Sequence, residues 1–454
     1  MGLRAGGSTS RRAGVSRQAI APGRRRIGLL RDRQEPAAQF RGNQKRPRPF
    51  KWRPLLQRSR TSGVFDTRMH YPSPNCRARQ SWRANFSGMR PAPKSEIGNR
   101  SRKGNSYGCH ENYLVDRRTP FPRIVRDLTP FFVTRQIFTG AGKLGSESAR
   151  GSEQRIVYQL TQRADFFEAE VGLETTLKRP IINTRDEPHA DVNRYRRFHV
   201  ILGDSNMSEW ATAMKIGTTS LVLDLIERGK APQLEIAQPI DANKSISRDQ
   251  TYDWIIELKD GRKISAIDVQ RIYLKAAADI DNGGGEDRQW ILREWENVLN
   301  DLERDVMVSR DRVDWAAKKF LLNALEEEEK LAWSDPWLQS IDLEYHNVDL
   351  ERGLYYELVR QGSMRRIVNE DEIKMSIFTP PETTRAFFRG RSVARFNDEI
   401  TSIQWDEIVF ANGSQSRRVA LPEASLDARL DALNLAARNG KDFVEFIRAL
   451  SEID

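Results

Sequence analysis

The sequence predicts an α+β fold, in which short strands and amphipathic helices share one core, followed by a small C-terminal domain. Three stretches carry this prediction. Residues 196–204 alternate between polar and apolar side chains and run into a helical pattern. Residues 251–277 repeat that order around an Asp-Gly turn, and residues 286–330 hold two helical apolar stripes. With 454 residues and 38% hydrophobic content, the chain is long enough to bury a sizeable core.

The first hundred residues differ from the rest in charge. Residues 1–103 hold 26 of the 74 Lys and Arg but only 4 of the 63 Asp and Glu, so the net charge of +11 comes from this leader and the remainder is acidic. The acidic body therefore does not predict nucleic-acid binding. Residues 1–102 lack any helical or strand period, which predicts either a disordered basic arm or an out-of-frame translation.

Cysteine usage and hydropathy indicate the compartment. Two cysteines, Cys76 and Cys109, cannot build a disulfide framework, which fits a reducing cytoplasm. No apolar run approaches the roughly 18 residues that a membrane span needs, and the basic N-terminus lacks the apolar segment of a secretory signal. We therefore expect a cytoplasmic protein without a membrane partner.

The acidic body opens with a Gly-rich turn and a polar strand. His110 and Asn112 share a face of this strand, because alternate side chains of a strand point the same way. The apolar stretch that follows predicts a helix ending at Gly140. Residues 166–186 alternate like strands, with Pro180 at an edge or a bend.

The next stretch predicts a strand, a tight polar turn and a helix. Arg197 and His199 lie on one face of the strand, opposite an apolar face. Asn206 and Glu209 have the spacing of a capping box, which would start the helix. Gly229 is a plausible residue to end it.

The remaining elements are mostly helical. After the Asp-Gly turn, Ser265 is expected to cap a helix. Residues 286–304 and 311–330 predict two amphipathic helices. A β-rich piece around residues 402–413 precedes a C-terminal helix that begins near Ser425.

The histidines and arginines of the body are the candidates for binding a metal ion and phosphates. The body holds four histidines, of which His110 and His199 lie on polar strand faces, whereas His189 and His346 are interpreted as structural. Imidazoles suit a divalent ion, and guanidinium groups suit the phosphates that such an ion carries. Walker, dinucleotide-binding, Cys-pair zinc and Gly-x-Ser-x-Gly patterns are absent from the sequence. The residues alone therefore indicate a metal–phosphate site on a sheet.

Four strings extend this interpretation: GNSYGCHENYL, RPIINTRDEPHADVNRYRRFHVILGDSNMSE, MKIGTTSLVLDLIE and PPETTRAFFRG. They resemble the Pup ligase/deamidase family over roughly residues 99–454. Pup is the small bacterial ubiquitin-like protein that marks substrates for the proteasome. The resemblance implies a glutamine-synthetase-like, curved antiparallel sheet packed with helices at residues 103–375 and a small C-terminal domain at residues 376–454.

The resemblance also implies roles for individual residues. His110 and His199 match Mg²⁺-site positions, Asn112 and Arg197 match nucleotide contacts, and Arg185 matches an arginine near the substrate and phosphates. ATP and Mg²⁺ are the implied cofactors; Pup, pupylated proteins and the proteasome system are the implied partners. The alternative is that Arg185 and Arg197 only pair with neighbouring carboxylates, namely Asp186, Glu187 or Asp204.

Two branches of the family compete. The run FFEAEVGLETTLKR resembles the deamidase/depupylase branch, whereas GDSNMSE and SYGCHENYL are closer to the ligase branch. The longer strings favour a depupylase, which would hydrolyse the isopeptide bond between Pup and a substrate lysine and the C-terminal Gln amide of Pup. Three alternatives stay open: a Pup–protein ligase, an inactive nucleotide-binding remnant, and nucleic-acid binding by the basic leader.

The catalytic strands of the family do not occur in the given reading frame. Family members carry a Gly-x-Glu-x-Glu-type strand and a second strand with Asn-Gly-Ala-Arg-Phe-Tyr, a catalytic Asp and Pro-Glu-Tyr-Ser. Codons for residues 50–69 can be chosen so that reading one base later restores this second strand. We therefore expect residues 41–87, and at most everything before Lys103, to be an out-of-frame translation. No catalytic residue is then visible in the chain.

Overall fold

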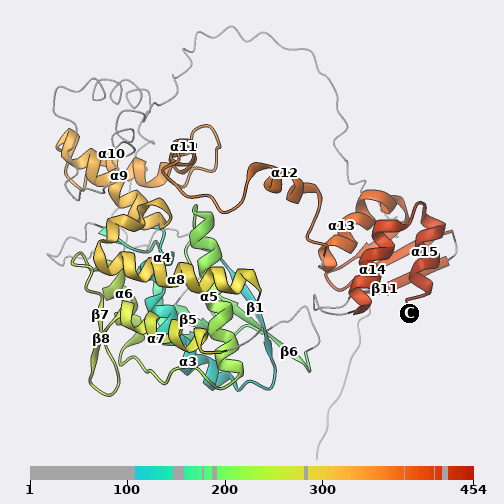
Figure 1. Cartoon of the computed structure of the whole chain (residues 1–454), viewed down its shortest axis with the longest axis horizontal. Helices are drawn as coiled ribbons and strands as arrows, with labels where there is room; N and C mark the ends of the chain where they lie inside the picture. Colours follow the sequence, from blue (N-terminus) through green and yellow to red (C-terminus); the bar gives the residue numbers. More distant parts are fainter. Residues whose placement is uncertain are drawn as a thin grey trace, which may run out of the picture. The chain divides into compact units, whose positions relative to one another are not determined.

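The structure is a computed structural model that describes residues 108–146, 158–175, 178–186, 192–280, 285–382, 384–413, 415–421 and 428–453 (Figure 1). The basic leader, Glu187 and His189 lie outside these described residues.

Short strands in the body pair two by two. Three pairs are antiparallel: β1 (Glu111–Asp116) with β6 (Tyr195–Val200), β2 (Lys143–Leu144) with β3 (Tyr158–Gln159), and β7 (Ile255–Glu257) with β8 (Lys263–Ser265).

One further pair departs from the expected antiparallel sheet. β4 (Phe167–Gly172) and β5 (Arg179–Asn183) pair in parallel, and their register shifts opposite Arg179 and Pro180. Proline has no N–H to donate, so a regular ladder cannot continue through Pro180. Pro180 was expected at an edge or a bend, and the register of this pair is irregular next to it.

Helices make up most of the body. They are α3 (Phe121–Thr134), α4 (Gln136–Thr139), α5 (Glu209–Glu227), α6 (Pro239–Arg248), α7 (Ala266–Ala278), α8 (Glu286–Arg304), α9 (Asp314–Glu329), α10 (Pro336–Glu344), α11 (Leu354–Arg360) and α12 (Glu370–Phe378), with 3-10 turns at Ala164–Phe166 and Val306–Asp311. No helix among the described residues is long and apolar enough to cross a membrane.

Most predicted helices are present, with two corrections. The helix expected to end at Gly140 does end there, but it breaks at Arg135 into α3 and α4. The cap of α5 is Ser208, whose hydroxyl accepts from the backbone N–H of Ala211, and not Asn206. The side chain of Asn206 instead donates to Thr139 and Asp314, so a long-range contact overrides the local capping pattern.

The ends of the other helices follow local signals. α5 stops before Gly229, which has a φ of 67° that favours glycine. Ser265 caps α7 by accepting from Asp268, as expected. α8 spans the predicted residues, whereas α9 begins only at Asp314 because a 3-10 turn precedes it.

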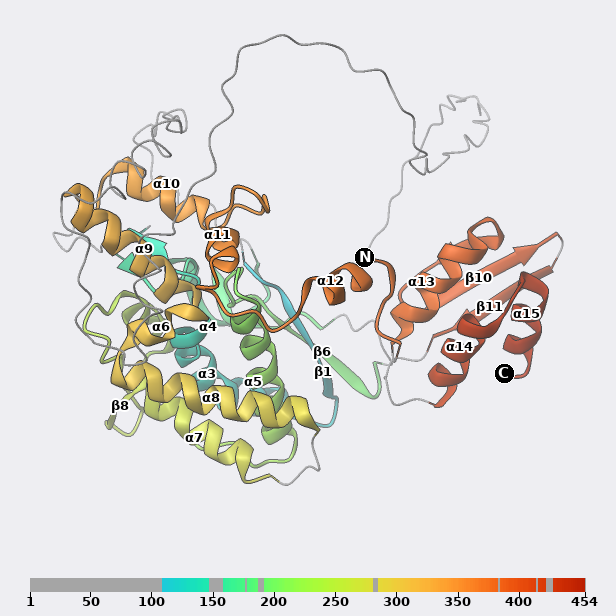
Figure 2. The same cartoon turned by 45° about the horizontal axis from the view of Figure 1, so that its top comes forward.

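One hydrophobic core lies behind β1 and β6. Helices α3, α5, α7 and α8 pack against one another, and β1 and β6 lie together alongside α5 (Figure 2). The inner face of the strands is apolar: Val115, Phe198 and Val200 are buried, and the Phe198 ring stacks on Phe132. The other face of the two strands is thereby left for polar side chains.

The C-terminal residues form a second core. Helices α13 (Arg385–Phe396), α14 (Ala428–Asn439) and α15 (Phe443–Ser451) accompany the antiparallel strands β9 (Ile400–Ile403), β10 (Glu407–Asn412) and β11 (Gln415–Ala420), which are ordered β11-β10-β9. Two C-terminal helices thus occur where one was expected. The predicted boundary at residue 375 falls within α12, and it stays a prediction.

Candidate functional site

Two histidines from neighbouring strands meet on the polar face of β1 and β6. In the register of this pair, Asn112 lies opposite His199, and His110 directly precedes β1. Nε2 of His199 lies 3.3 Å from Nδ1 of His110, and the ring centroids are 5.1 Å apart. His199 is buried, whereas His110 is exposed. The structure therefore brings these two sequence-predicted residues together; their role as Mg²⁺ ligands stays a prediction.

The two residues assigned to nucleotide contact also meet. Nη1 of Arg197 donates to Oδ1 of Asn112 over 2.8 Å, across the same strand pair as the histidines. Asp186 accepts from the backbone N–H of Arg197 (3.2 Å), while its carboxylate forms an ion pair with Arg117 (2.5 Å). Asp186 thus has a counter-charge in Arg117, while the alternative in which Arg185 and Arg197 only pair with neighbouring carboxylates stays open.

Arg185 lies just beyond β5 and is exposed. Its backbone N–H donates to Oδ1 of Asn183 (2.9 Å), and the same oxygen lies 3.3 Å from Nδ1 of His199. Asn183 is fully buried. It thus connects the turn that carries Arg185 to the imidazole of His199, a link that the sequence did not predict, although a polar residue ending a buried strand is a usable signal.

Arg163 is a second residue that the sequence did not single out. Its guanidinium group is buried, with only 3% of the residue exposed, and it packs against Gly108. A Cβ on Gly108 would lie 1.9 Å from Nη1 of Arg163, so any side chain at this position would displace the guanidinium group. Gly108, two residues before His110, thereby lies directly against the buried guanidinium group of Arg163.

Three guanidinium groups act on His110. Although His110 is exposed, partial loss of hydration lowers its pKa, and the positive charges of Arg163, Arg179 and Arg185 lower it further. Burial also lowers the pKa of Arg163 and of Arg179. This concentration of positive charge favours an anion, and it favours the neutral imidazole of His110, which is the form that binds a metal.

A buried ion pair holds β1 in place from behind. Glu111 points away from His110 and receives two hydrogen bonds from Arg135, of 2.5 and 3.0 Å. The hydroxyl of Tyr113 donates to the same carboxylate, and Arg135 donates to Thr219 of α5 (2.5 Å). Arg135 is the residue at which α3 and α4 separate. Arg135, which lies at the break between the two helices, therefore holds in place the strand that follows His110.

The described residues fit Mg²⁺ only in company with an anion. No group of three or more His, Cys, Asp or Glu gathers around a common point in the described part of the chain. Mg²⁺ prefers oxygen ligands, and two imidazoles beside three guanidinium groups would not attract a bare cation. Phosphate oxygens would neutralise the arginines and supply the missing ligands at once.

His346 takes part in a separate buried cluster, in keeping with its interpretation as structural. Its Nε2 lies 2.8 Å from Nζ of Lys318 and 2.8 Å from Nε2 of Gln162. Burial first, and then the charge of Lys318, lower the pKa of His346 to about 2. Lys318 pairs with Asp342 (2.6 Å). This cluster joins α9 to α10 and contributes no group to the polar face of β1 and β6.

Known proteins resemble this chain over most of its length. The Pup-ligase protein family matches residues 98–409. Pup deamidase/depupylase of Mycobacterium tuberculosis (strain ATCC 25618 / H37Rv) is 47% identical over 321 residues, and depupylase of Acidothermus cellulolyticus is 49% identical over 320 residues. Each alignment covers 69% of this chain and 63% of the relative, so the chain spans less than two thirds of the length of these depupylases.

Ligases of the family are similar as well. Pup–protein ligase of Pseudarthrobacter chlorophenolicus is 40% identical over 338 residues, covering 73% of both chains. A solved structure of the Pup ligase PafA in complex with ADP has 34% sequence identity, a TM-score of 0.64 and 74% coverage of both chains. A structure of the complex between Pup and PafA gives the same score. The predicted fold class is thereby confirmed, and the chain belongs to the Pup-ligase protein family.

Proposed function

We propose that this chain derives from a Pup deamidase/depupylase. Such an enzyme hydrolyses the isopeptide bond between the C-terminal Glu side chain of Pup and a substrate lysine; with a C-terminal Gln on Pup, ammonia leaves instead. The observation that carries the proposal is the pair of imidazoles, His110 and His199, beside Arg163, Arg179 and Arg185. The relatives named depupylase are 47–49% identical, against 39–40% for the ligases, which supports this branch.

In this proposal, the polar face of β1 and β6 binds Mg–ATP. His110 and His199 hold the metal, Asn112 and Arg197 contact the nucleotide, and Arg185 lies near substrate and phosphates. The ADP in a related ligase structure supports a nucleotide as ligand. When bound, Mg–ATP supplies a Lewis acid and phosphate oxygens beside the reacting carbonyl group.

The residues of the chain contribute orientation and charge. In the tautomer that carries its proton on Nδ1, His199 donates to Asn183, and its Nε2 carries the lone pair that would bind a metal. Arg163, held by burial against Gly108, presents a fixed positive charge to an oxyanion that develops during amide cleavage. Pup and pupylated proteins are the proposed substrates, in the setting of the bacterial proteasome.

The catalytic carboxylate is the part that this reading frame lacks. We infer that residues 41–87 replace the strand that would carry it, so the chain as printed binds nucleotide without cleaving Pup conjugates. Sequencing of the first three hundred bases of the coding DNA tests this inference directly. A frame identical to the printed one, without compensating shifts, would overturn it.

An assay separates the two branches of the family. The frame-restored enzyme is incubated with ATP, Mg²⁺ and a pupylated protein, and the conjugate is followed by gel electrophoresis. Release of the free substrate and Pup supports the depupylase. A stable conjugate, together with new conjugates formed from Pup and free substrate, would instead establish the ligase, which the GDSNMSE string favours.

A further inference from the structure

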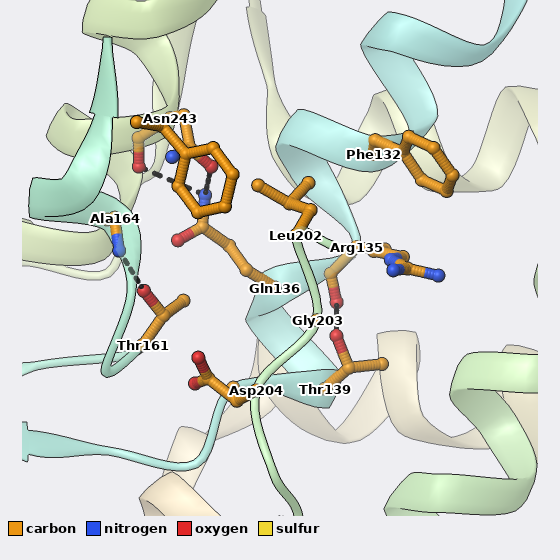
Figure 3. A pocket seen from close by; sticks show the side chains of 12 residues that line it. Phe132, Arg135, Gln136, Thr139, Thr161, Ala164, Leu202, Gly203, Asp204 and Asn243 are labelled. Atoms are coloured by element: carbon orange, nitrogen blue, oxygen red, sulfur yellow. Dashed lines mark hydrogen bonds between the residues drawn. The ribbon is translucent and has the colours of Figure 1, made fainter. Parts of the chain in front are cut away.

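Many buried polar side chains of the body are held by hydrogen bonds. Beside a small pocket, Gln136 donates to Asn243 (3.1 Å), and the hydroxyl of Thr161 accepts from the backbone N–H of Ala164 (2.9 Å) (Figure 3). Lys319 of α9 is an exception. Its side chain is half-buried, and no residue in the described part of the chain accepts a hydrogen bond from its Nζ. An ammonium group that is partly withdrawn from water without an acceptor loses its proton more easily.

Two aromatic rings take the place of the missing acceptors. Nζ of Lys319 lies 4.0 Å from the ring centroid of Trp333 and 5.2 Å from that of Tyr158. Tyr158 is buried, and its hydroxyl donates to the backbone carbonyl of Trp315 (2.8 Å). α9 ends before Lys330, whose φ of 53° is left-handed, and beyond this turn Trp333 reaches back to the side chain of Lys319. The fold thus surrounds one amine with aromatic side chains from two other segments.

The neighbouring lysine has the opposite surroundings. Lys318 is completely buried, and its Nζ donates to the backbone carbonyl of Gly142 (2.9 Å) and to Asp342 (2.6 Å). For Lys319, burial lowers the pKa to about 8, although the charge of Glu326 raises it. Two lysines that are adjacent in the sequence therefore differ in their hydrogen bonds and in their access to solvent.

We propose that Lys319 is a nucleophilic lysine that takes an acyl group from a small acyl thioester. The neutral amine attacks the carbonyl carbon, a C–N bond forms, and the C–S bond breaks as the thiolate leaves with its electron pair. The proton released by the nitrogen neutralises the thiolate, so the products are an amide and a thiol, and nothing is oxidised or reduced. The amide is uncharged, so acylation removes the cation from beside the two rings.

A thioester suits this amine because its reaction with an amine needs neither a metal nor a nucleotide. A short aliphatic acyl chain would also contact the apolar surface of the Trp333 ring. The inference does not depend on the proposed function, since Lys319 contributes no group to the polar face of β1 and β6.

Acylation rates at individual lysines test the proposal. The full chain is incubated with acetyl-coenzyme A, and initial rates are measured by peptide mass spectrometry at Lys319 and at Lys374, a lysine of α12 whose side chain is 71% exposed. At pH 7, about one in ten amines with a pKa of about 8 is neutral, against about one in three thousand with the ordinary value of 10.5.

The lower basicity and the half-burial of Lys319 offset part of this difference. We therefore expect Lys319 to react at least about tenfold faster than Lys374 at pH 7. An equal or lower rate at Lys319 would overturn the proposal.

The dependence of the rate on pH gives a test that is independent of access to the amine. Between pH 7 and pH 9, the neutral fraction rises about tenfold for an amine with a pKa of about 8, and about a hundredfold for an ordinary lysine. The rate at Lys319 should follow the first of these increases, and the rate at Lys374 the second. A hundredfold increase at Lys319 would contradict the proposal.

A pair of variants assigns the reaction to one residue. Lys319→Arg keeps a cation beside the two rings but removes the amine, so acetylation of the chain at pH 7 should lose its fastest phase. Lys374→Arg is the matched control and should retain that phase. A fast phase that persists in Lys319→Arg would show that another amine reacts.

Discussion

Nε2 of His199 lies 3.3 Å from Nδ1 of His110, although the two residues are 89 positions apart in the sequence. The antiparallel register of β1 and β6 creates this contact, because Asn112 rather than Glu111 lies opposite His199. A slip of one residue would turn Glu111 toward the polar face and His110 away from it. The buried pair between Glu111 and Arg135 opposes such a slip.

Loss of either imidazole should weaken Mg²⁺-dependent nucleotide binding. We expect His199→Ala to raise the Kd for Mg–ATP by about tenfold or more, since one charge-assisted contact contributes roughly 1.5–3 kcal/mol. Isothermal titration calorimetry measures this change. Arg118→Ala, at an exposed position that pairs with Asp116 two residues before it, serves as the control and should leave the Kd unchanged. Equal affinity in His199→Ala and in the unaltered chain would refute the metal-site assignment.

The charge of Arg163 should be visible in the titration of His110. The Arg163 guanidinium lowers the pKa of His110, so Arg163→Gln should move that pKa upward, toward its ordinary value. NMR titration of the imidazole signals would follow the shift. Mg–ATP binding by the original chain should decline only as the pH falls through the lowered pKa of His110, because protonation removes the metal-binding lone pair. In the variant, the decline should begin at higher pH. A pKa of His110 that does not respond to Arg163→Gln would contradict the electrostatic account.

The stability of the fold should depend on pH through His346. Its pKa of about 2 in the folded protein lies below the ordinary value of 6.5. Between these values the unfolded chain binds a proton that the folded chain does not, so stability falls as the pH is lowered below about 6.5. The slope contributed by this one group is at most about 1.4 kcal/mol per pH unit. Urea unfolding at several pH values measures it.

A variant isolates the contribution of this histidine. His346→Gln removes the titrating group while keeping a side chain that can accept from Lys318. Its stability should therefore change less between pH 7 and pH 5 than that of the original chain. Identical pH dependence in both proteins would show that His346 is not the group responsible.

Breaking the ion pair behind β1 should destabilise the body. Glu111→Gln leaves the guanidinium of Arg135 buried without a full counter-charge, and removing one partner of a buried pair costs about 3–5 kcal/mol. Denaturant unfolding monitored by tryptophan fluorescence measures this loss. The double variant Glu111→Gln, Arg135→Met should lose less than the sum of the two single losses, since neither charge then remains buried alone. Additive losses would indicate that the two residues act independently.

Local sequence patterns predicted the elements whose signals are local. The apolar stripe of residues 286–304 gave both ends of α8, and Ser265 and Gly229 mark the start and the end of two helices as expected. The alternation of polar and apolar residues around Arg197 and His199 predicted that these two side chains lie on the same face of the strand. These predictions succeed because the spacing of apolar residues and the capping of a helix depend on residues that are close together in the sequence.

Long-range contacts explain what the sequence did not predict. Arg135 lies at the helix break and pairs with Glu111, which precedes it by 24 residues. Asn206 donates to Asp314, 108 residues away, and does not cap the helix as expected. Arg163 and Asn183 approach the histidines only once the strands have assembled. The roles of the site residues themselves rest on family resemblance, because spacing alone indicated no more than a metal and a phosphate.

A crystal structure of the chain with Mg²⁺ and a non-hydrolysable ATP analogue tests the central claim most directly. We predict that the metal contacts His110 and His199, and that the phosphate oxygens lie within hydrogen-bonding distance of Arg163 or Arg185. Nucleotide bound at another surface, or imidazoles that contact neither metal nor phosphate, would contradict the proposed site.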